Sequence, residues 1–138
     1  MNLQTSDATA IATALRSGQT TAKAVVNATL EQIAQRNPTL NSFTTITAQS
    51  AIAQSEQIDN AIAQGKEPGI LAGVPFAVKN LFDIAGLPTL AGSKINADNP
   101  PAQRDATAIV RLKQAGAILV GALNMDEYAY GREPNQKP

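Results

Sequence analysis

The sequence predicts an α/β protein in which an amino-terminal helical layer is followed by one strand–loop–helix–strand unit of a mixed or parallel sheet that is incomplete. Apolar residues recur at helical spacing through most of residues 1–65. In residues 74–79 they alternate with other residues, as in a strand. In residues 117–122 they form an unbroken run, which is typical of a buried strand. A chain of 138 residues, 43% of them hydrophobic, fits a single domain.

The first two predicted helices follow from the spacing of apolar side chains. One spans residues 6–17, with Ser6 placed to cap its start. The other begins at Thr20 or Thr21 and carries one apolar stripe, formed by Val26, Leu30 and Ile33. We expect it to stop at Asn37-Pro38, because proline disfavours helical geometry in the residue before it. Both apolar faces require a packing partner.

The next segment combines a short β-prone run with a third helix. Residues 42–46 are β-prone, and residues 47–64 show a helical pattern whose inward positions are Ala51, Ser55, Ile58 and Ile62. Gly65 is suited to a left-handed helix end. Residues 66–72 contain a proline and two glycines, and we interpret them as a connector into a different architecture.

Lys79 ends the first strand of the predicted sheet unit. Three large apolar side chains alternate along this strand and define one face, formed by Val74, Phe76 and Val78. The period of two then places Lys79 on the opposite face. Residues 80–104 show no sustained periodicity, and loops of this length inside compact domains are uncommon unless they are functional.

A helix and a buried strand complete the unit. Asp105 is a suitable N-cap for a helix over residues 106–115, and the apolar strand 117–122 follows. A strand, a helix and a buried strand form a crossover, so we expect the two strands to be parallel neighbours. Ligands of such sheets bind at the carboxyl ends of strands. Lys79 and Asn124 both fall at such ends.

The composition argues against several classes of function. Eleven basic residues balance eleven acidic ones, so no net charge attracts a nucleic acid or an anionic membrane. The chain has neither cysteine nor histidine, and it lacks the glycine motifs that bind phosphates. We therefore expect no cofactor, no metal and no nucleic-acid partner. No signal-peptide pattern and no membrane-length apolar run occurs, which predicts a soluble cytoplasmic protein.

Lys79 has two interpretations. A lysine at a strand end is commonly just a solvated charge. Here the run Asn80-Leu81-Phe82-Asp83 follows, and its bulky apolar residues would desolvate the amine and favour its neutral form. Because a neutral lysine can act as a base, Lys79 is the candidate catalytic residue.

Two further segments carry reactive side chains. Asp126 and Glu127 could form a catalytic carboxylate pair, but two acids after a strand more commonly begin a helix, whose dipole they complement. Ser93 could be a nucleophile activated by Lys94. Adjacent side chains rarely face each other, however, and no strand-to-helix elbow surrounds this serine. We interpret Ser93 as a loop serine.

Three segments of the sequence resemble the amidase signature family. They are Gly73-Val74-Pro75-Phe76-Ala77-Val78-Lys79-Asn80-Leu81-Phe82-Asp83, Ala115-Gly116-Ala117, and Asn124-Met125-Asp126-Glu127-Tyr128-Ala129-Tyr130-Gly131. They occur in the order and at the spacing of the family. Within the family, the Leu-Ala-Gly-Ser-Lys-Ile-Asn run and the Met-Asp-Glu segment look closest to carboxybiuret hydrolases, with the A subunits of glutamyl-tRNA amidotransferases as near relatives.

The resemblance implies a hydrolase that cleaves linear carbon–nitrogen amide bonds of a small-molecule substrate with a Ser, cis-Ser, Lys triad. Lys79 matches the triad lysine, which takes a proton from the bridging serine, and that serine in turn deprotonates the nucleophile. We expect Met125 and Tyr128 to line the substrate pocket. The family segments that carry the two serines do not occur in this sequence.

The resemblance also implies how the chain is organised. Residues 1–131 are expected to form the amino-terminal part of an amidase domain, with residues 1–65 mainly helical and residues 73–131 forming the sheet unit. Residues 132–138 depart from the family pattern, and we expect a disordered tail. A truncated, frameshifted or split gene product would each explain this, and such a chain is expected to be inactive alone. The alternative is a noncatalytic interaction module that binds a small helical subunit or a complementing amidase fragment.

Overall fold

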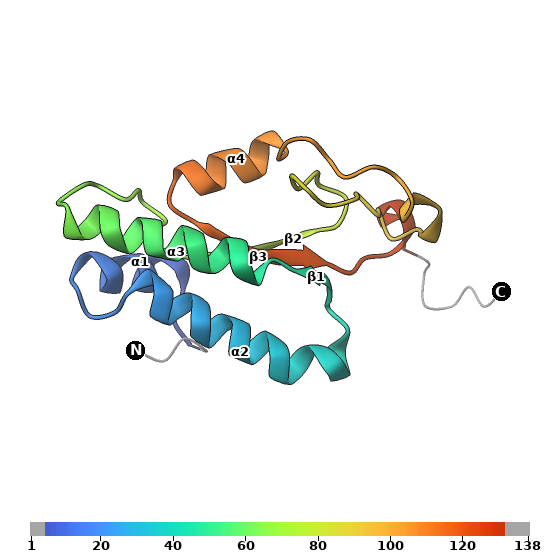
Figure 1. Ribbon diagram of the computed structural model, residues 1–138. Coiled ribbons are helices and arrows are strands. Elements are labelled where there is room, and N and C mark those ends of the chain that lie inside the picture. The colour runs from blue at the N-terminus through green and yellow to red at the C-terminus, as the bar shows by residue number, and fades with distance from the viewer. Residues whose placement is uncertain (1–4, 132–138) are drawn as a thin grey trace.

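A three-stranded sheet lies at the centre of the computed structural model, which describes residues 5–131 (Figure 1). The strands are β1 (Phe43–Ile46), β2 (Pro75–Lys79) and β3 (Ile118–Leu123), in the order β1-β3-β2. β2 is parallel to β3, and β1 is antiparallel to it. β3 takes the centre because it is apolar throughout, so both of its faces need cover, and all but its last residue are buried. The predicted mixed sheet and its parallel crossover are confirmed.

Helices cover both faces of the sheet. One core lies between the sheet and α1 (Ala8–Arg16), α2 (Ala22–Leu40) and α3 (Ala48–Ala63), and a second lies between the sheet and α4 (Thr107–Gln114). Ile118 and Val120 of β3 belong to the first core, whereas Leu119 and Ala122 belong to the second. Within the described residues, no helix is both long and apolar enough to span a bilayer.

The start of α1 differs from the prediction. The helix begins at Ala8, and its N-cap is Asp7 in place of the expected Ser6. The Asp7 carboxylate accepts a hydrogen bond of 2.8 Å from the Ala10 amide. An ionised carboxylate also interacts favourably with the positive end of the helix dipole, which a serine hydroxyl does not. The predicted spacing of the helix was correct, and only its cap was wrong.

α2 continues through Pro38 to Leu40, so the expected stop at Asn37-Pro38 is wrong. Pro38 lies so close to the helix end that it removes one hydrogen bond without interrupting a longer ladder. Asn41 then adopts a left-handed conformation with φ 49°, and its amide donates to the Asn37 carbonyl at 2.7 Å. The Asn37 side chain accepts from the Phe43 amide at 2.8 Å, which directs the chain into β1.

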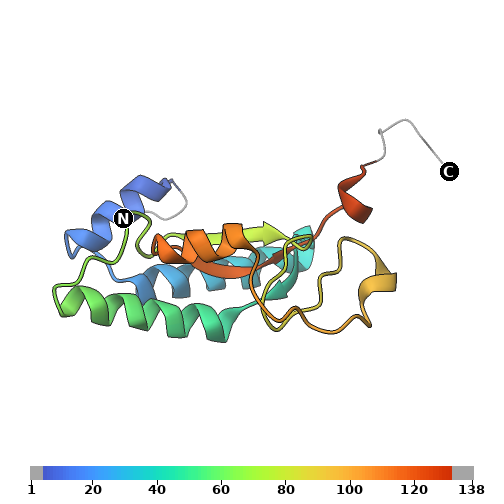
Figure 2. The ribbon, with the colours of Figure 1, turned by 90° about the horizontal axis from the view of Figure 1, so that it is seen from above.

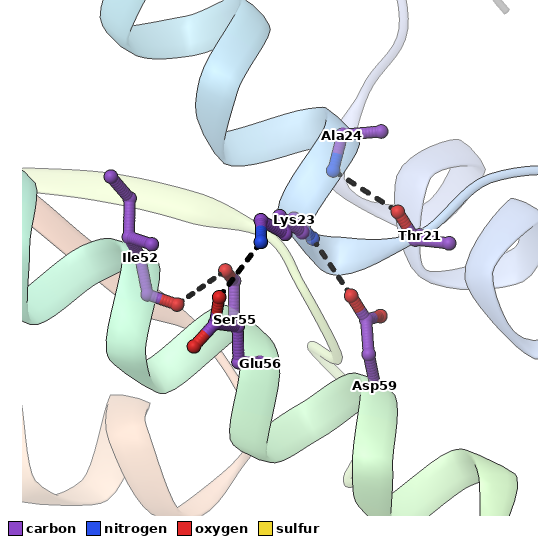
Figure 3. A network of polar contacts seen from close by, with 7 residues as sticks. All are labelled: Thr21, Lys23, Ala24, Ile52, Ser55, Glu56 and Asp59. Atoms are coloured by element: carbon purple, nitrogen blue, oxygen red, sulfur yellow. Dashed lines mark hydrogen bonds and ion pairs between the residues drawn. The ribbon is translucent and has the colours of Figure 1, made fainter.

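The amino-terminal end of α2 is fixed to α3 by a polar network (Figure 3). The Asp59 carboxylate of α3 accepts hydrogen bonds from the amides of Ala22 at 2.7 Å and Lys23 at 3.0 Å. Thr21 caps the helix from within, accepting from the Ala24 amide at 3.1 Å. The Lys23 amine pairs with Glu56 at 2.8 Å, and the hydrogen bond and charge of Glu56 raise the pKa of Lys23. The free amides of one helix are therefore satisfied by another helix.

α3 and the connector after it follow the prediction. Ala51, Ser55 and Ile58 are buried, and Ile62 is partly buried against the same core. Gly65 adopts the left-handed conformation expected at the end of the helix, with φ 71°. The predicted helix 47–64 is thus confirmed within one residue at each end.

The faces of β2 differ from the prediction. Val74 precedes the strand and packs with Ala77 on the α1–α3 core, whereas Phe76 and Val78 pack on the α4 core. The faces alternate from Phe76 to Val78, but Val74 lies before the first residue of the strand and does not follow this alternation. The expectation that Val74, Phe76 and Val78 share one face is therefore wrong. Both faces of β2 are packed against helices.

Asp105 does not cap α4, contrary to expectation. The helix begins at Thr107 after Ala106, with no side-chain cap. The Asp105 carboxylate instead accepts from the Ala85 amide at 2.8 Å and from the Lys113 amine at 2.6 Å. A charged amine is a stronger partner than a helix amide, so the carboxylate turns toward Lys113. Asp105 thereby ties the long loop to α4.

Candidate active site

Lys79 and Asn124 lie side by side at one edge of the sheet, as the parallel crossover predicts. Lys79 is the last residue of β2 and pairs in register with Leu123, which Asn124 follows. Figure 2 shows the loop 80–104 and the segment after β3 beyond this same end of the sheet. A cleft of about 520 Å³ opens there, lined by Asn41, Ser42, Lys79, Leu123, Asn124, Met125 and Asp126.

One wall of this cleft comes from the junction between α2 and β1. The Asn124 side chain donates to the Asn41 carbonyl at 3.1 Å, and the Asn124 amide donates to the Ser42 carbonyl at 2.7 Å. The Asn124 side-chain oxygen also accepts from the Met125 amide at 2.9 Å. Asn124 therefore holds the end of β3 against the end of α2. The sequence did not single out Asn41 or Ser42, because their approach to Lys79 depends on the pairing of β1 with β3.

The Lys79 side chain is exposed in the cleft. Leu81 and Phe82 are themselves 38% and 37% exposed, and a turn in which the Phe82 amide donates to the Lys79 carbonyl carries the chain out of the strand. The expectation that these two residues desolvate the amine is therefore wrong. Among the described residues the Lys79 amine has no ion-pair partner, although Asp126 lines the same cleft. The exposed amine is therefore accessible to a ligand that enters the cleft.

The two substrate-pocket candidates are placed differently. Met125 lines the cleft with Lys79. Tyr128 is 57% exposed and does not line it, and its hydroxyl accepts a hydrogen bond of 3.0 Å from the Asn96 side chain. Tyr128 contacts the long loop because its backbone turns through a left-handed conformation with φ 51°. The structure thus brings only Met125 beside Lys79.

Ser93 and Glu127 form a bridge between the long loop and the segment after β3. Ser93 is buried, and its hydroxyl donates to the Glu127 carboxylate at 2.6 Å. Gly92 beside it has φ 72°, and a Cβ atom there would come within 2.7 Å of the Met125 and Asp126 carbonyls. Glu127 opens a short 3-10 helix, Glu127–Ala129, in accord with the structural interpretation of the two acids. Glu127 is therefore bound to Ser93, and only Asp126 reaches the cleft.

Asn80 follows Lys79 directly and is a buried residue that sequence reasoning did not single out. The residue is 4% exposed, although it directly follows the exposed Lys79. Buried amides are normally fully hydrogen-bonded, and both side-chain atoms of Asn80 have partners. The only sequence signal was a polar residue at the point where a strand ends, which does not distinguish a buried amide from a solvated one.

No metal-binding arrangement is found in the described part of the chain. Within residues 5–131, no group of three or more aspartate or glutamate side chains comes close enough to hold a metal ion. Asp126 is the one acid among the residues that line the cleft, and a single carboxylate provides too few oxygen ligands for a cation site.

Residues 24–137 match the amidase family. The chain is 50% identical over 117 residues to the AtzE subunit of 1-carboxybiuret hydrolase from Pseudomonas sp. (strain ADP), covering 85% of this chain and 26% of that protein. It is 42% identical over 131 residues to the A subunit of glutamyl-tRNA(Gln) amidotransferase from Bdellovibrio bacteriovorus, and this match covers 95% of this chain and 26% of that protein. The chain thus spans about a quarter of the length of these relatives.

Solved structures agree with these matches. One of them is described as a vestigial protein complex that reveals the evolutionary origins of an s-triazine catabolic enzyme. It has a TM-score of 0.86 and is 50% identical in sequence, and the match covers 88% of this chain and 26% of that one. A bacterial aryl acylamidase of the amidase signature family has a TM-score of 0.83 and is 30% identical, and this match covers 89% of this chain and 26% of that one. The predicted resemblance to carboxybiuret hydrolases and to the A subunits of amidotransferases is confirmed, and the chain belongs to the amidase signature family, as an amino-terminal portion of such an enzyme.

Proposed function

We propose that this chain is the amino-terminal part of an amidohydrolase acting on linear carbon–nitrogen amide bonds of a small molecule, with Lys79 as its proton acceptor. The observation that carries the proposal is the position of Lys79. Its amine stands in an open cleft at the carboxyl edge of the sheet, beside Met125 and without an ion-pair partner among the described residues. Ligands of α/β sheets collect at this edge. The 50% identity to the AtzE subunit of 1-carboxybiuret hydrolase favours a carboxybiuret-type substrate.

The proposed role requires two serines near Lys79, and residues 5–131 place one at most beside it. Three of the chain's serine hydroxyls donate to fixed acceptors elsewhere, namely Ser17 to Ala14, Ser55 to Ile52 and Ser93 to Glu127. Only Ser42 lines the cleft with Lys79. One serine cannot serve both as the bridge that gives its proton to lysine and as the nucleophile. We therefore propose that the 138-residue polypeptide is inactive alone and that both serines come from a complementing amidase segment.

The proposal is tested in a completed enzyme in which residues 1–131 replace the matching part of the AtzE subunit of 1-carboxybiuret hydrolase. We expect this chimera to hydrolyse carboxybiuret, and we expect Lys79→Ala to lower kcat by about 10²–10⁴-fold, the usual contribution of a positioned base. Lys79→Arg should not restore activity, because a guanidinium does not release its proton. Steady-state assays of product release measure each effect.

Lys66→Ala is the matched control for this test, because Lys66 is an exposed lysine in the connector after α3 and does not line the cleft. It should leave kcat unchanged. An active chimera in which Lys79→Ala turns over as fast as the Lys66→Ala protein would contradict the role of Lys79. Hydrolysis of carboxybiuret by the 138-residue chain itself, abolished by Lys79→Ala, would contradict the proposed inactivity.

A groove between α1, α2 and the sheet favours a second candidate function, a noncatalytic interaction module. The groove has a volume of about 470 Å³ and is mainly apolar, with walls that include Ile11, Ile33, Leu40, Phe43, Val74 and Pro75. Leu40 is 64% exposed, and Arg36 adds one positive charge. Such a groove fits the apolar face of an amphipathic helix. The partner in this case would be a small helical subunit.

Affinity capture from the native cell distinguishes the two candidates. The bait is the full chain, with Leu40→Asp as the matched control, because this exposed side chain should tolerate substitution without unfolding. Mass spectrometry identifies the proteins retained by the bait and by the control, and a partner that binds the groove should be lost only from Leu40→Asp. A small helical protein supports the interaction module. An amidase segment that carries the two serines supports the enzyme.

A further inference from the structure

Asn80 connects the end of β2 to three other segments. Its backbone amide donates to the Leu123 carbonyl at 3.0 Å, and its carbonyl accepts from the Ala91 amide at 2.8 Å. Its side-chain oxygen accepts from the Leu90 amide at 3.0 Å, and its side-chain nitrogen donates to the Thr44 hydroxyl at 2.8 Å. At 4% exposure these groups have little access to water. The residue next to Lys79 therefore has four hydrogen bonds to protein partners.

The contact with Thr44 joins strands that are not neighbours. β1 and β2 flank β3 from opposite sides, so the Asn80 side chain reaches past the central strand. The Thr44 hydroxyl in turn donates to the Ala122 carbonyl of β3 at 3.3 Å. Asn80, Thr44 and Ala122 thus link all three strands at the edge where Lys79 stands. A strand end held on both sides has little freedom to rotate, and Lys79 is part of that strand end.

The contacts with Leu90 and Ala91 extend to the segment that follows β3. Ala91 has a left-handed backbone with φ 49°, which is costly for a residue other than glycine and persists only when its surroundings hold it. Its carbonyl accepts from the Tyr128 amide at 2.7 Å, just after the cleft residues Met125 and Asp126. The hydrogen bond from Ser93 to Glu127 ties the same two segments a second time. A continuous chain of hydrogen bonds therefore runs from Asn80 through Ala91 to Tyr128, two residues after the cleft residue Asp126.

We propose that Asn80 is a positioning residue of the Lys79 site, which holds Lys79 and the Met125–Asp126 wall in one geometry through the loop segment 89–93. The catalytic part of this inference rests on the proposed function, whereas the structural part does not. Asn80 does not line the cleft, so it acts through its neighbours and not on a substrate. It is chemically suited to this place, since an amide combines a donor and an acceptor without adding a buried charge.

The structural part is tested on the full chain by hydrogen exchange of individual amides. In Asn80→Ala, we expect the exchange rates of the Leu90, Ala91 and Tyr128 amides to rise by about tenfold or more, as expected when a locally closed segment opens. The Ile118 amide, which donates to Val74 within the core, should keep its rate. Asn99→Ala is the matched control, since Asn99 is an exposed asparagine of the same loop that bonds only locally to Asn96.

Two further variants keep this test decisive if Asn80→Ala loses its fold, which faster exchange at Ile118 would reveal. Thr44→Val removes the partner of the Asn80 side-chain nitrogen and leaves the bond to Leu90 in place. Asn80→Asp keeps an acceptor for Leu90 and can accept a hydrogen bond from the Thr44 hydroxyl, so it should restore part of the protection at Leu90. Unchanged exchange at Leu90, Ala91 and Tyr128 in a folded Asn80→Ala would overturn the proposal. If that variant unfolds, the Ala91 and Tyr128 amides of Thr44→Val decide it: faster exchange supports the proposal, and unchanged exchange overturns it.

The catalytic part is tested in the completed chimera. We expect Asn80→Ala to lower kcat by about 100-fold, the effect of a misplacement near 1 Å, with KM changed by less than about threefold. Asn80→Asp should recover part of kcat, and Asn99→Ala should behave as the parent. The positioning role is overturned if Asn80→Ala changes only KM, or if it changes neither kcat nor KM. If Lys79→Ala leaves the chimera fully active, the proposed function fails. The hydrogen-exchange test of Asn80 does not depend on that result.

Discussion

Asp105 shows how a single carboxylate connects two parts of this molecule. Its side chain is 12% exposed and contacts both the Ala85 amide and the Lys113 amine. Burial alone would raise the pKa of Asp105, but the hydrogen bonds from Lys113 and Ala85, together with the charge of Lys113, outweigh it. The net effect is a pKa lowered from the usual 3.8. The carboxylate form is therefore favoured by folding, and its contribution to stability depends on pH.

We predict that Asp105→Asn lowers the free energy of unfolding at pH 7 by about 1–2 kcal/mol, because it removes a charge-assisted hydrogen bond. The stabilisation from a lowered pKa is fully present above the unfolded value of 3.8 and is lost as the pH falls through the lower folded value. The difference between parent and variant should therefore shrink below about pH 4. Urea unfolding at a series of pH values measures it.

Asp98→Asn is the control for this experiment, since Asp98 is an exposed aspartate of the same loop for which the described residues provide no ion pair. It should leave the free energy of unfolding nearly unchanged at every pH. A difference between Asp105→Asn and the parent that stays constant from pH 7 to pH 3 would contradict the ionic origin of the effect.

At the level of elements, the position of α2 is decided at its two ends. Its amino-terminal amides are held by Asp59 of α3, and its last turn contains Pro38 before the left-handed Asn41. The carbonyl of Asn41 then accepts from Asn124 at the cleft. The helix therefore connects the α2–α3 interface to the Lys79 site. Its length matters, because a helix that stopped at Asn37 would not deliver Asn41 and Ser42 to the cleft.

We predict that Asp59→Ala lowers the free energy of unfolding by about 1–2 kcal/mol, the usual effect of losing a helix cap. The physical reason is that the amides of Ala22 and Lys23 lose their acceptor at the partly buried α2–α3 interface. Chemical denaturation monitored by circular dichroism measures the change. Because the groups involved are backbone amides, the effect should persist at high salt.

Glu56→Gln is the matched control on the same helix. The pair of Lys23 and Glu56 has both side chains about half exposed, and exposed ion pairs contribute only about 0–1 kcal/mol. Removing this ion pair should therefore lower the free energy of unfolding only slightly, and this difference should vanish at high salt. If Glu56→Gln costs as much as Asp59→Ala, the ion pair would be the main link between α2 and α3, and the capping explanation would be wrong.

For the whole molecule, the described sheet has two outer edges, since β1 and β2 flank β3 without further strands among residues 5–131. Several large apolar side chains are also strongly exposed, including Leu40, Ile70 and Ile95 at 64%, 76% and 76%. Unpaired strand edges are a feature that stable monomers usually cover. They are consistent with a chain that matches about a quarter of its relatives.

We predict that the 138-residue chain is marginally stable as a monomer, because its sheet edges and apolar side chains stay in contact with water. Its thermal unfolding should be broad, with a midpoint at or below about 45 °C, the lower limit of ordinary domains. Circular dichroism at several concentrations, with sedimentation to establish the monomer, measures this. The completed chimera is the control and should melt more sharply and at higher temperature. A sharp, cooperative transition of the monomeric chain well above that midpoint would contradict the prediction.

Spacing along the chain was enough to predict the kinds of element, their order and the place of Lys79 at a strand end. Those features depend on near neighbours, and the helical periods, the β2–α4–β3 crossover and the buried strand were correctly predicted from them. The polar contacts were not predictable in this way. Four features depend instead on competition among partners in the folded protein. They are the capping of α1 by Asp7 in place of Ser6, the ion pair of Asp105 with Lys113, the continuation of α2 past Pro38 and the exposure of Lys79.

The contact between Asn80 and Thr44 shows why the folded arrangement was needed. The two residues lie 36 positions apart and become partners only when β1 and β2 take opposite sides of β3. Periodicity is a local property of the chain, whereas hydrogen bonds between distant segments form only after the sheet has assembled.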